Sequence, residues 1–195
     1  MRMTFLRRKL TTVAGSIALG LAALTGADRA QAQDQYGNPG VATMEDCLSI
    51  NPAQVEAAHT GGSWKLVQGS NWLFDFGNDA DSEQQARTAN RIIRHYGINQ
   101  TCYVGRPGPS MTYLLSERRA PQGGVQGEDC INFNANALEL RAEGNRWLMS
   151  DGRSRMAMFD DAGEAHLALF LVQYYGFTHQ CFIGRPNPPL RYWRR

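Results

Sequence analysis

The segment that decides the fold is residues 102–109, CYVGRPGP, because it recurs near the end of the chain as residues 181–188, CFIGRPNP. A second motif, Glu-Asp-Cys, occurs at residues 45–47 and again at 128–130. Internal similarity of this density indicates a tandem duplication. We therefore expect both repeats to have the same fold, which can be predicted from one repeat unit.

The similarity continues between the two motifs, since Trp64 and Trp147 follow the first Cys of their units at the same distance. A unit of about 70 residues has a marginal hydrophobic core and benefits from a covalent cross-link. We expect an N-terminal linker, repeat one, a second linker and repeat two, at residues 33–43, 44–116, 117–126 and 127–195.

The N-terminal residues have the three parts of a secretory signal peptide. Residues 2–9 carry four cationic side chains, residues 13–25 form an apolar run, and Ala30-Gln31-Ala32 offers small residues for cleavage. The apolar run of about thirteen residues is shorter than the roughly 20 of a membrane-spanning helix, which favours cleavage over an uncleaved anchor. We expect a signal peptide at 1–32, export by the general secretory route rather than the twin-arginine route, and no transmembrane helix afterwards.

Charge and composition narrow the function classes. The chain has 195 residues, of which 43% are hydrophobic and 19% charged, as in globular proteins. Residues 1–32 hold five of the 20 Lys and Arg residues and one of the 18 Asp and Glu residues, so removing them changes the formal net charge from +2 to −2. A near-neutral mature chain lacks the concentrated basic field of nucleic-acid-binding proteins, which disfavours that partner.

Each repeat contains two cysteines at matching places, Cys47 and Cys102 in the first and Cys130 and Cys181 in the second. An exported protein meets an oxidising compartment. Of the three possible connectivities, duplication favours one bridge within each repeat. A redox or metal-binding pair would need a C-x-x-C motif or a close Cys/His cluster, and the sequence has neither. We expect structural disulfides, each worth about 3 to 4 kcal/mol by the chain-entropy model.

Alternation of apolar and polar residues predicts about five short strands in each repeat. We expect them at 47–50, 64–67, 72–76, 101–104 and 111–115, and at 130–133, 147–149, 156–159, 180–183 and 190–193. One amphipathic helix lies between the third and fourth strand of each repeat. Asp81 or Ser82 begins the first helix and Asp161 the second, and Gly97 and Gly176 end them. The predicted fold class is α+β, each repeat being a small, mostly antiparallel sheet with one packed helix and one disulfide.

The two predicted helices differ in polarity. The second carries three apolar residues, Leu167, Leu169 and Phe170, where the first carries Thr88, Asn90 and Arg91. An apolar helix flank has to be covered. Two interpretations stay open: the second helix docks against repeat one, or these residues form the interface of a homodimer or of a partner protein.

No catalytic set is visible in either repeat. The four histidines have no histidine at the matching place in the other repeat, and neither a Ser/His/acid set nor a metal-binding H-E-x-x-H motif nor a phosphate-binding Gly-rich loop occurs. The acidic run 78–83 lacks the ligand spacing of a calcium loop and suits the start of a helix. We expect a protein that is not an enzyme and that has no metal site and no cofactor.

Each repeat has two motifs with charged side chains, Glu-Asp before the first cysteine and Gly-Arg-Pro after the second. If each disulfide joins antiparallel strands, Asp46 comes close to Arg106, and Asp129 to Arg185. A structural ion pair is one interpretation. The other is that the two arginines, in rigid prolyl loops, donate hydrogen bonds to a carboxylate, a sulfate or a sugar hydroxyl.

Aromatic residues near these loops suggest stacking against sugar rings, although core packing explains the aligned tryptophans more simply. Trp72 aligns with Arg155 and Trp193 with Leu114, and an unshared tryptophan is the better candidate for an exposed platform. The candidate ligand-binding residues are Arg106, Arg185, Tyr103, Tyr113, Trp72 and Trp193.

The combination of Glu-Asp-Cys, the following Trp, FDFG at 74–77, HYG at 95–97 and the Cys-x-x-Gly-Arg-Pro motif resembles a repeated domain found in exported bacterial proteins. The resemblance covers both repeats and nearly all of the mature chain. It implies an exported compartment and a modular construction, without an activity. Repeat two departs from the pattern, because Met158 stands where repeat one has Asp75.

These observations favour a periplasmic or secreted, non-enzymatic binding module that recognises a glycan or another envelope ligand through the duplicated Gly-Arg-Pro loops. Two weak linked sites would gain avidity. The alternative is a structural or inhibitory envelope protein that acts through protein–protein contact at residues Leu167, Leu169 and Phe170.

Overall fold

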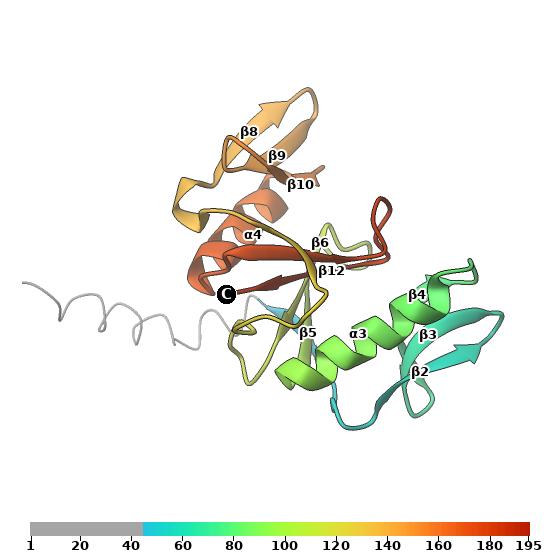
Figure 1. Cartoon of the computed structure of the whole chain (residues 1–195). Helices are drawn as coiled ribbons and strands as arrows, with labels where there is room; N and C mark the ends of the chain where they lie inside the picture. The colour runs from blue at the N-terminus through green and yellow to red at the C-terminus, as the bar shows by residue number, and fades with distance from the viewer. Residues whose placement is uncertain (1–44) are drawn as a thin grey trace, which may run out of the picture. The chain divides into compact units, whose positions relative to one another are not determined.

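The computed structural model describes residues 45–195 (Figure 1). The expected signal peptide and N-terminal linker lie outside these residues. The described part combines two α-helices with twelve β-strands, which form four antiparallel sheets of three strands each. Neither helix has the length and apolar character that crossing a membrane requires.

The elements follow the same order in both halves of the described chain. Repeat one contains β1 (Asp46–Ser49), β2 (Val55–Thr60), β3 (Ser63–Gln68), β4 (Asn71–Gly77), α3 (Ser82–Tyr96), β5 (Gln100–Val104) and β6 (Met111–Leu115). Repeat two contains β7 (Asp129–Asn132), the short 3₁₀ helix η1 (Ala135–Ala137), β8 (Glu139–Glu143), β9 (Arg146–Ser150), β10 (Arg155–Phe159), α4 (Ala162–Tyr174), β11 (His179–Ile183) and β12 (Leu190–Arg194).

The strands of each repeat divide between two sheets, so the expectation of one sheet with about five strands is wrong. A meander sheet is formed by β2, β3 and β4 in repeat one and by β8, β9 and β10 in repeat two. A disulfide sheet has the order β1-β5-β6 or β7-β11-β12. The additional strands, β2 and β8, are edge strands of mixed composition, VEAAHT and ELRAE, whose weak alternation hides them in the sequence.

Both expected disulfides are present. Cys47 pairs in register with Cys102 across β1 and β5, and Cys130 with Cys181 across β7 and β11. Each bridge joins Cα atoms 4.0 Å apart. The second cysteine of each repeat lies on the central strand of its sheet and is fully buried.

Local hydrogen bonds explain the helix ends. The Asp161 carboxylate accepts a bond of 2.9 Å from the backbone N–H of Glu164, which confirms the predicted cap of α4. Asp81 makes no such bond at α3; instead the Ser82 hydroxyl donates to the carbonyl of Phe76 at 2.8 Å. Gly97 ends α3 in the left-handed conformation, with φ of 60°.

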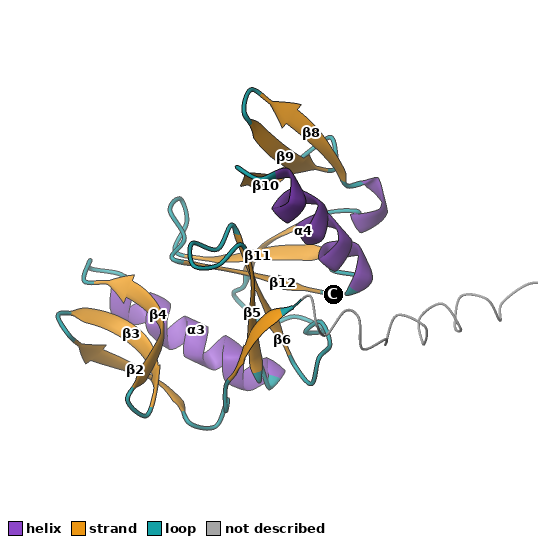
Figure 2. Cartoon of the chain, turned by 180° about the vertical axis from the view of Figure 1, so that it is seen from behind, coloured by secondary structure: helices purple, strands orange, loops and turns teal. Residues whose placement is uncertain are grey.

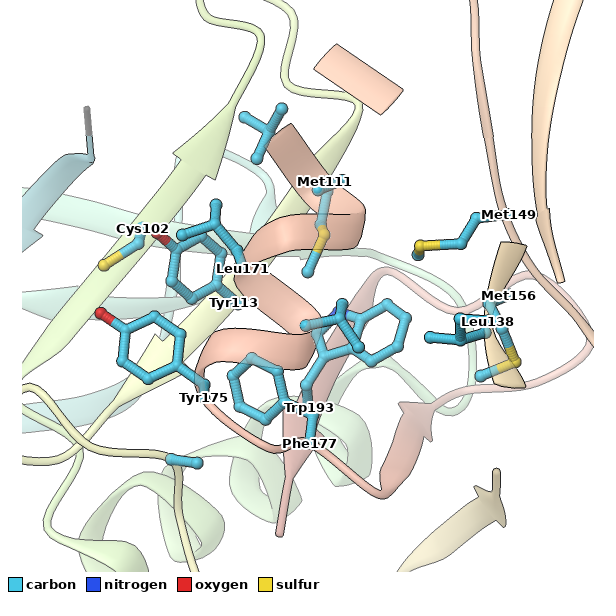
Figure 3. Close-up of a cluster of buried hydrophobic side chains, with 14 of the residues drawn as sticks. Cys102, Met111, Tyr113, Leu138, Met149, Met156, Leu171, Tyr175, Phe177 and Trp193 are labelled. Carbon is cyan, nitrogen blue, oxygen red and sulfur yellow. The ribbon is translucent and has the colours of Figure 1, made fainter. Parts of the chain in front are cut away.

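Each hydrophobic core combines elements of both repeats. In the α3 core, α3 and the meander sheet of repeat one pack with Ile183, Leu190 and Tyr192 from the disulfide sheet of repeat two. In the α4 core, α4 and its meander sheet pack with the disulfide sheet of repeat one, from which Met111 and Tyr113 point toward the helix (Figure 3). The repeats therefore exchange their disulfide sheets.

Each helix lies beside the meander sheet of its own repeat (Figure 2). The apolar flank of α4, formed by Leu167, Leu169 and Phe170, packs against the α4 core and remains partly exposed. This core includes strands of repeat one, so the second helix packs against repeat one, whereas an interface of the flank with a second copy or a partner protein stays a prediction.

Candidate functional site

The Gly-Arg-Pro loops place both arginines in ion pairs, as the structural interpretation predicts. Arg106 donates from one terminal nitrogen to the Asp46 carboxylate at 2.9 Å. Arg185 donates to Asp129 through two nitrogens. Each guanidinium also covers a ring, Arg106 at 5.2 Å from the centroid of Tyr103 and Arg185 at 4.7 Å from that of Phe182. One face of each ring is therefore covered by an arginine of the same loop.

The glycine of each loop lies against the helix of the other repeat. Gly105 has φ of 80°, and a Cβ on it would come within 2.5 Å of the Glu164 carboxyl group in the first turn of α4. Gly184 has φ of 81°, and its Cβ would come within 2.7 Å of the Gln85 side chain in α3. The positive φ favours glycine, and a Cβ would displace the end of a flexible side chain, Glu164 or Gln85. The Gly-Arg-Pro motif thus has a role in packing the two repeats together.

The glutamate of each Glu-Asp-Cys motif accepts two tyrosine hydroxyls, one from each repeat. Glu45 accepts from Tyr113 at 2.8 Å and from Tyr175 at 2.5 Å. We call these three residues the Glu45 clamp. The Glu128 clamp is equivalent and consists of Glu128, Tyr96 and Tyr192, with hydroxyl–carboxylate distances of 2.8 and 2.5 Å.

Burial raises the pKa of all four clamp tyrosines, and the hydrogen bond to the carboxylate raises it further. These hydroxyls stay protonated at neutral pH and act as donors. Each clamp glutamate also lies near the two cysteines of its repeat. Because those cysteines form disulfides, they offer no thiolate to a metal ion.

Two of the expected ligand-binding aromatics are buried. Tyr113 is fully buried in the Glu45 clamp. Trp193 is 2% exposed and packs edge-on against Phe133, with ring centroids 5.6 Å apart. The expectation of an exposed platform at Trp193 is wrong, because this side of β12 faces the α4 core.

Among the expected ligand-binding aromatic residues, Trp72 has a largely exposed ring. It is 65% exposed, and the Lys65 ammonium lies 5.9 Å from the centroid of its ring. Lys65 also contacts the Asp75 carboxylate at 3.4 Å, and the Ser63 hydroxyl donates to the same carboxylate at 3.1 Å. We call Ser63, Lys65, Trp72 and Asp75 the Trp72 surface.

Asp75 is held as a carboxylate. The backbone N–H of Gly77 donates to it at 2.9 Å and is the main cause that lowers its pKa, with smaller contributions from Ser63 and Lys65. The Trp72 surface therefore combines an aromatic ring, an ammonium donor and a permanent acceptor on one face of the meander sheet.

A β-bulge brings Trp72 and Asp75 to the same face of the sheet. Residues three apart on a regular strand point to opposite faces. In β4, however, Trp72 pairs with Val67 and Phe74 with Leu66, so that Leu73 is an extra residue in the register. Leu73 and Phe74 both pack toward the α3 core, and Trp72 and Asp75 both point away from it.

Repeat two has the same bulge but does not have the residues of the Trp72 surface. The register of β10 shifts at the matching place, between Arg155 and Ala157. Arg155 stands in place of Trp72 and pairs with Glu143 at 2.7 Å, and Met158 replaces Asp75. Sequence comparison shows these differences, but the common face depends on a bulge that the residue pattern does not reveal.

Comparisons with models of protein families, with characterised proteins and with solved structures find no match for this chain.

Proposed function

We propose that the protein is an exported, non-enzymatic binding module that recognises a glycan through the Trp72 surface of repeat one. The observation that carries this proposal is the Trp72 ring, 65% exposed beside the ionised Asp75 carboxylate. Tryptophan is enriched among the residues that contribute most to binding energy at interfaces.

The chemistry of the surface suits a sugar. The apolar face of a pyranose ring stacks on an indole, while its hydroxyl groups need both acceptors and donors nearby. Asp75 supplies the acceptor and Lys65 the donor. The bonds from Gly77 and Ser63 hold the carboxylate in place before the ligand arrives, which lowers the entropic cost of binding.

We place the glycan on this surface and not on the duplicated Gly-Arg-Pro loops. Each loop arginine covers a face of the neighbouring ring, Tyr103 or Phe182, so the loops lack the exposed aromatic side chain that Trp72 provides. We therefore propose a single glycan site, in repeat one, in place of two equivalent sites that bind with avidity.

A glycan array followed by calorimetry tests the proposal. We expect a saturable ligand whose affinity falls at least tenfold in Trp72→Ala and severalfold in Asp75→Asn, because the stacking face or the charged acceptor is lost. The control is Arg155→Ala at the matching position of repeat two, which leaves binding unchanged. An array without a saturable ligand, or equal binding by Trp72→Ala, would contradict the proposal.

Export is tested separately by the intact mass of protein recovered outside the cytoplasm. We expect a chain that begins near Gln33 and becomes heavier by about 4 Da on reduction, since each disulfide takes up two hydrogens. An N-terminus at Met1 would contradict cleavage of the signal peptide, and free thiols would contradict disulfide formation in an oxidising compartment.

The partly exposed flank of α4 supports a second candidate, protein–protein contact. Phe170 stacks on Tyr174 with ring centroids 5.8 Å apart, beside the partly buried Leu167 and Leu169. Light scattering of the wild-type protein and Phe170→Asp tests it. A dimer that Phe170→Asp dissociates supports the candidate, and a monomer in both cases removes the homodimer.

A further inference from the structure

An open groove of about 720 Å³ lies between the edge strand β2 and helix α3, on elements separate from the Trp72 surface. Three arginines of α3 line one side of the groove, Arg87, Arg91 and Arg94, and Glu56 and Ala57 of β2 line the other. Within the described chain this groove gathers positive charge, although removal of the expected signal peptide would leave a formal net charge of only −2.

Strand β2 offers an unpaired backbone edge to the groove. It is bonded only to β3 in its sheet. Thr60 pairs with Ser63 across a turn formed by two glycines, and the antiparallel alternation from this pair leaves Val55, Ala57 and His59 with backbone groups that point away from β3. Arg94 already uses one of these groups, since it donates to the Val55 carbonyl at 2.8 Å. A side chain of α3 thus satisfies part of the edge.

The arginines of the groove are available in different degrees. Arg91 is exposed and has neither a hydrogen-bond nor an ion-pair partner among the described residues. Arg87 pairs with Glu83 at 2.8 Å, but both side chains are about half exposed, and a pair of this kind contributes little to stability. A ligand carboxylate can therefore replace Glu83, and Arg91 is free to receive another.

Repeat two does not have these arginines at the matching helix positions. His166, Phe170 and Gln173 stand where α3 has Arg87, Arg91 and Arg94. Gln173 still bonds to the backbone, at the carbonyl of Ala135, at 3.2 Å. Ala135 belongs to the 3₁₀ helix η1 and not to the edge strand β8, so this bond differs from that of Arg94 to β2. The three arginines are confined to repeat one.

We propose that the β2–α3 groove binds an extended acidic peptide of a partner protein, which adds as a strand to β2 and directs its carboxylates to Arg87 and Arg91. Strand addition uses the free backbone groups of Ala57 and His59, and the arginines select acidic side chains. The spacing is suitable: four helical residues rise about 6 Å, and alternate residues of a strand lie about 6.7 Å apart.

Fluorescence anisotropy with the full mature protein tests the charge requirement. The probe is a labelled octapeptide of alternating Glu and Val, with the corresponding Lys and Val peptide as its negative control. We expect saturable binding that weakens at least tenfold in Arg91→Glu and weakens as salt is raised. Arg191→Glu, which reverses an exposed arginine on β12, has the same net charge and should bind within twofold of wild type.

Amide hydrogen exchange tests the strand addition. Saturating peptide should slow exchange at Ala57 and His59 by more than about tenfold, because their N–H groups become hydrogen-bonded. Ala58, which already pairs with Lys65, should change little.

Three results would overturn the proposal: no saturable binding of the acidic peptide, equal binding by Arg91→Glu, or unchanged exchange at Ala57 and His59. An oligogalacturonate that binds in place of the peptide, and depends on Arg91, would overturn it in favour of an anionic glycan. Because this groove and the Trp72 surface share no residue, each can fail while the other stands.

Discussion

The hydroxyl of Tyr175, just after helix α4 of repeat two, donates a hydrogen bond of 2.5 Å to the carboxylate of Glu45, in the first motif of repeat one. The Glu128 clamp repeats the contact in the opposite sense, with Tyr96 of repeat one. Each repeat thus supplies the acceptor for a tyrosine that ends the other repeat's helix. The glutamate of each Glu-Asp-Cys motif therefore bonds to the helix end of the other repeat, and the two contacts join the repeats where their disulfide sheets are exchanged.

Removing the hydroxyl of Tyr175 should destabilise the protein. We expect Tyr175→Phe to lower the free energy of unfolding by about 1.5 to 3 kcal/mol, since a bond to a charged acceptor in a buried site is lost. Tyr96→Phe should cost less, because Glu128 also receives the N–H of Val125 and lies 3.2 Å from Arg194. Urea unfolding at neutral pH measures both, with Tyr103→Phe as the control. An equal loss in Tyr103→Phe would contradict the clamp.

The raised pKa of the clamp tyrosines makes stability depend on alkaline pH. In the unfolded chain their pKa is about 10, and below this pH both states hold the proton, so the stabilisation is fully present. Above it the unfolded chain loses protons that the folded protein keeps. Stability should therefore fall as pH rises, by up to about 1.4 kcal/mol per pH unit for each clamp tyrosine.

Urea midpoints measured on both sides of pH 10 check this dependence, together with the tyrosinate absorbance of the folded protein. The clamp tyrosines should ionise only as the protein unfolds. Ionisation of every tyrosine near pH 10 without unfolding would show that the hydroxyls are accessible and the clamps absent.

The contact of Gly105 with helix α4 can be tested by adding a methyl group. We expect Gly105→Ala to cost about 1 to 3 kcal/mol, because a Cβ is strained at positive φ and displaces the Glu164 carboxyl group. Glu164→Ala in the same protein should restore only the steric part. Gly108→Ala is the matched control, since its Cβ meets no atom within 4 Å and its φ is not positive. Equal costs at both glycines would refute the contact.

Repeat one by itself should not form a stable monomer. Without repeat two, the α3 core loses Ile183, Leu190 and Tyr192, which are all nearly fully buried. Each lost side chain removes about 1.5 to 3 kcal/mol of hydrophobic stabilisation, a large share for a unit of about 70 residues. Circular dichroism and light scattering of residues 44–116 check this. A cooperatively folded monomer would show that the exchanged sheet is dispensable.

The residues alone predicted the features that depend on local geometry or on duplication. Matching cysteine positions gave both disulfide pairings, and the antiparallel register that follows brings Asp46 to Arg106 and Asp129 to Arg185. The cap at Asp161 and the left-handed Gly97 follow from residue preferences within one helical turn. In each case the interacting residues are close in the chain or held by a covalent bond.

The tertiary structure decided which surfaces meet. An apolar stripe on α3 has the same pattern whether it packs against its own disulfide sheet or against that of the other repeat, so periodicity cannot show the exchange. The burial of Trp193 follows from that choice, because β12 presents one face to each core. The common face of Trp72 and Asp75 depends likewise on a one-residue bulge, which lets both Leu73 and Phe74 pack toward the α3 core. The sequence by itself determined the repeats, their disulfides and their helices, and packing between distant segments determined the cores and the candidate site.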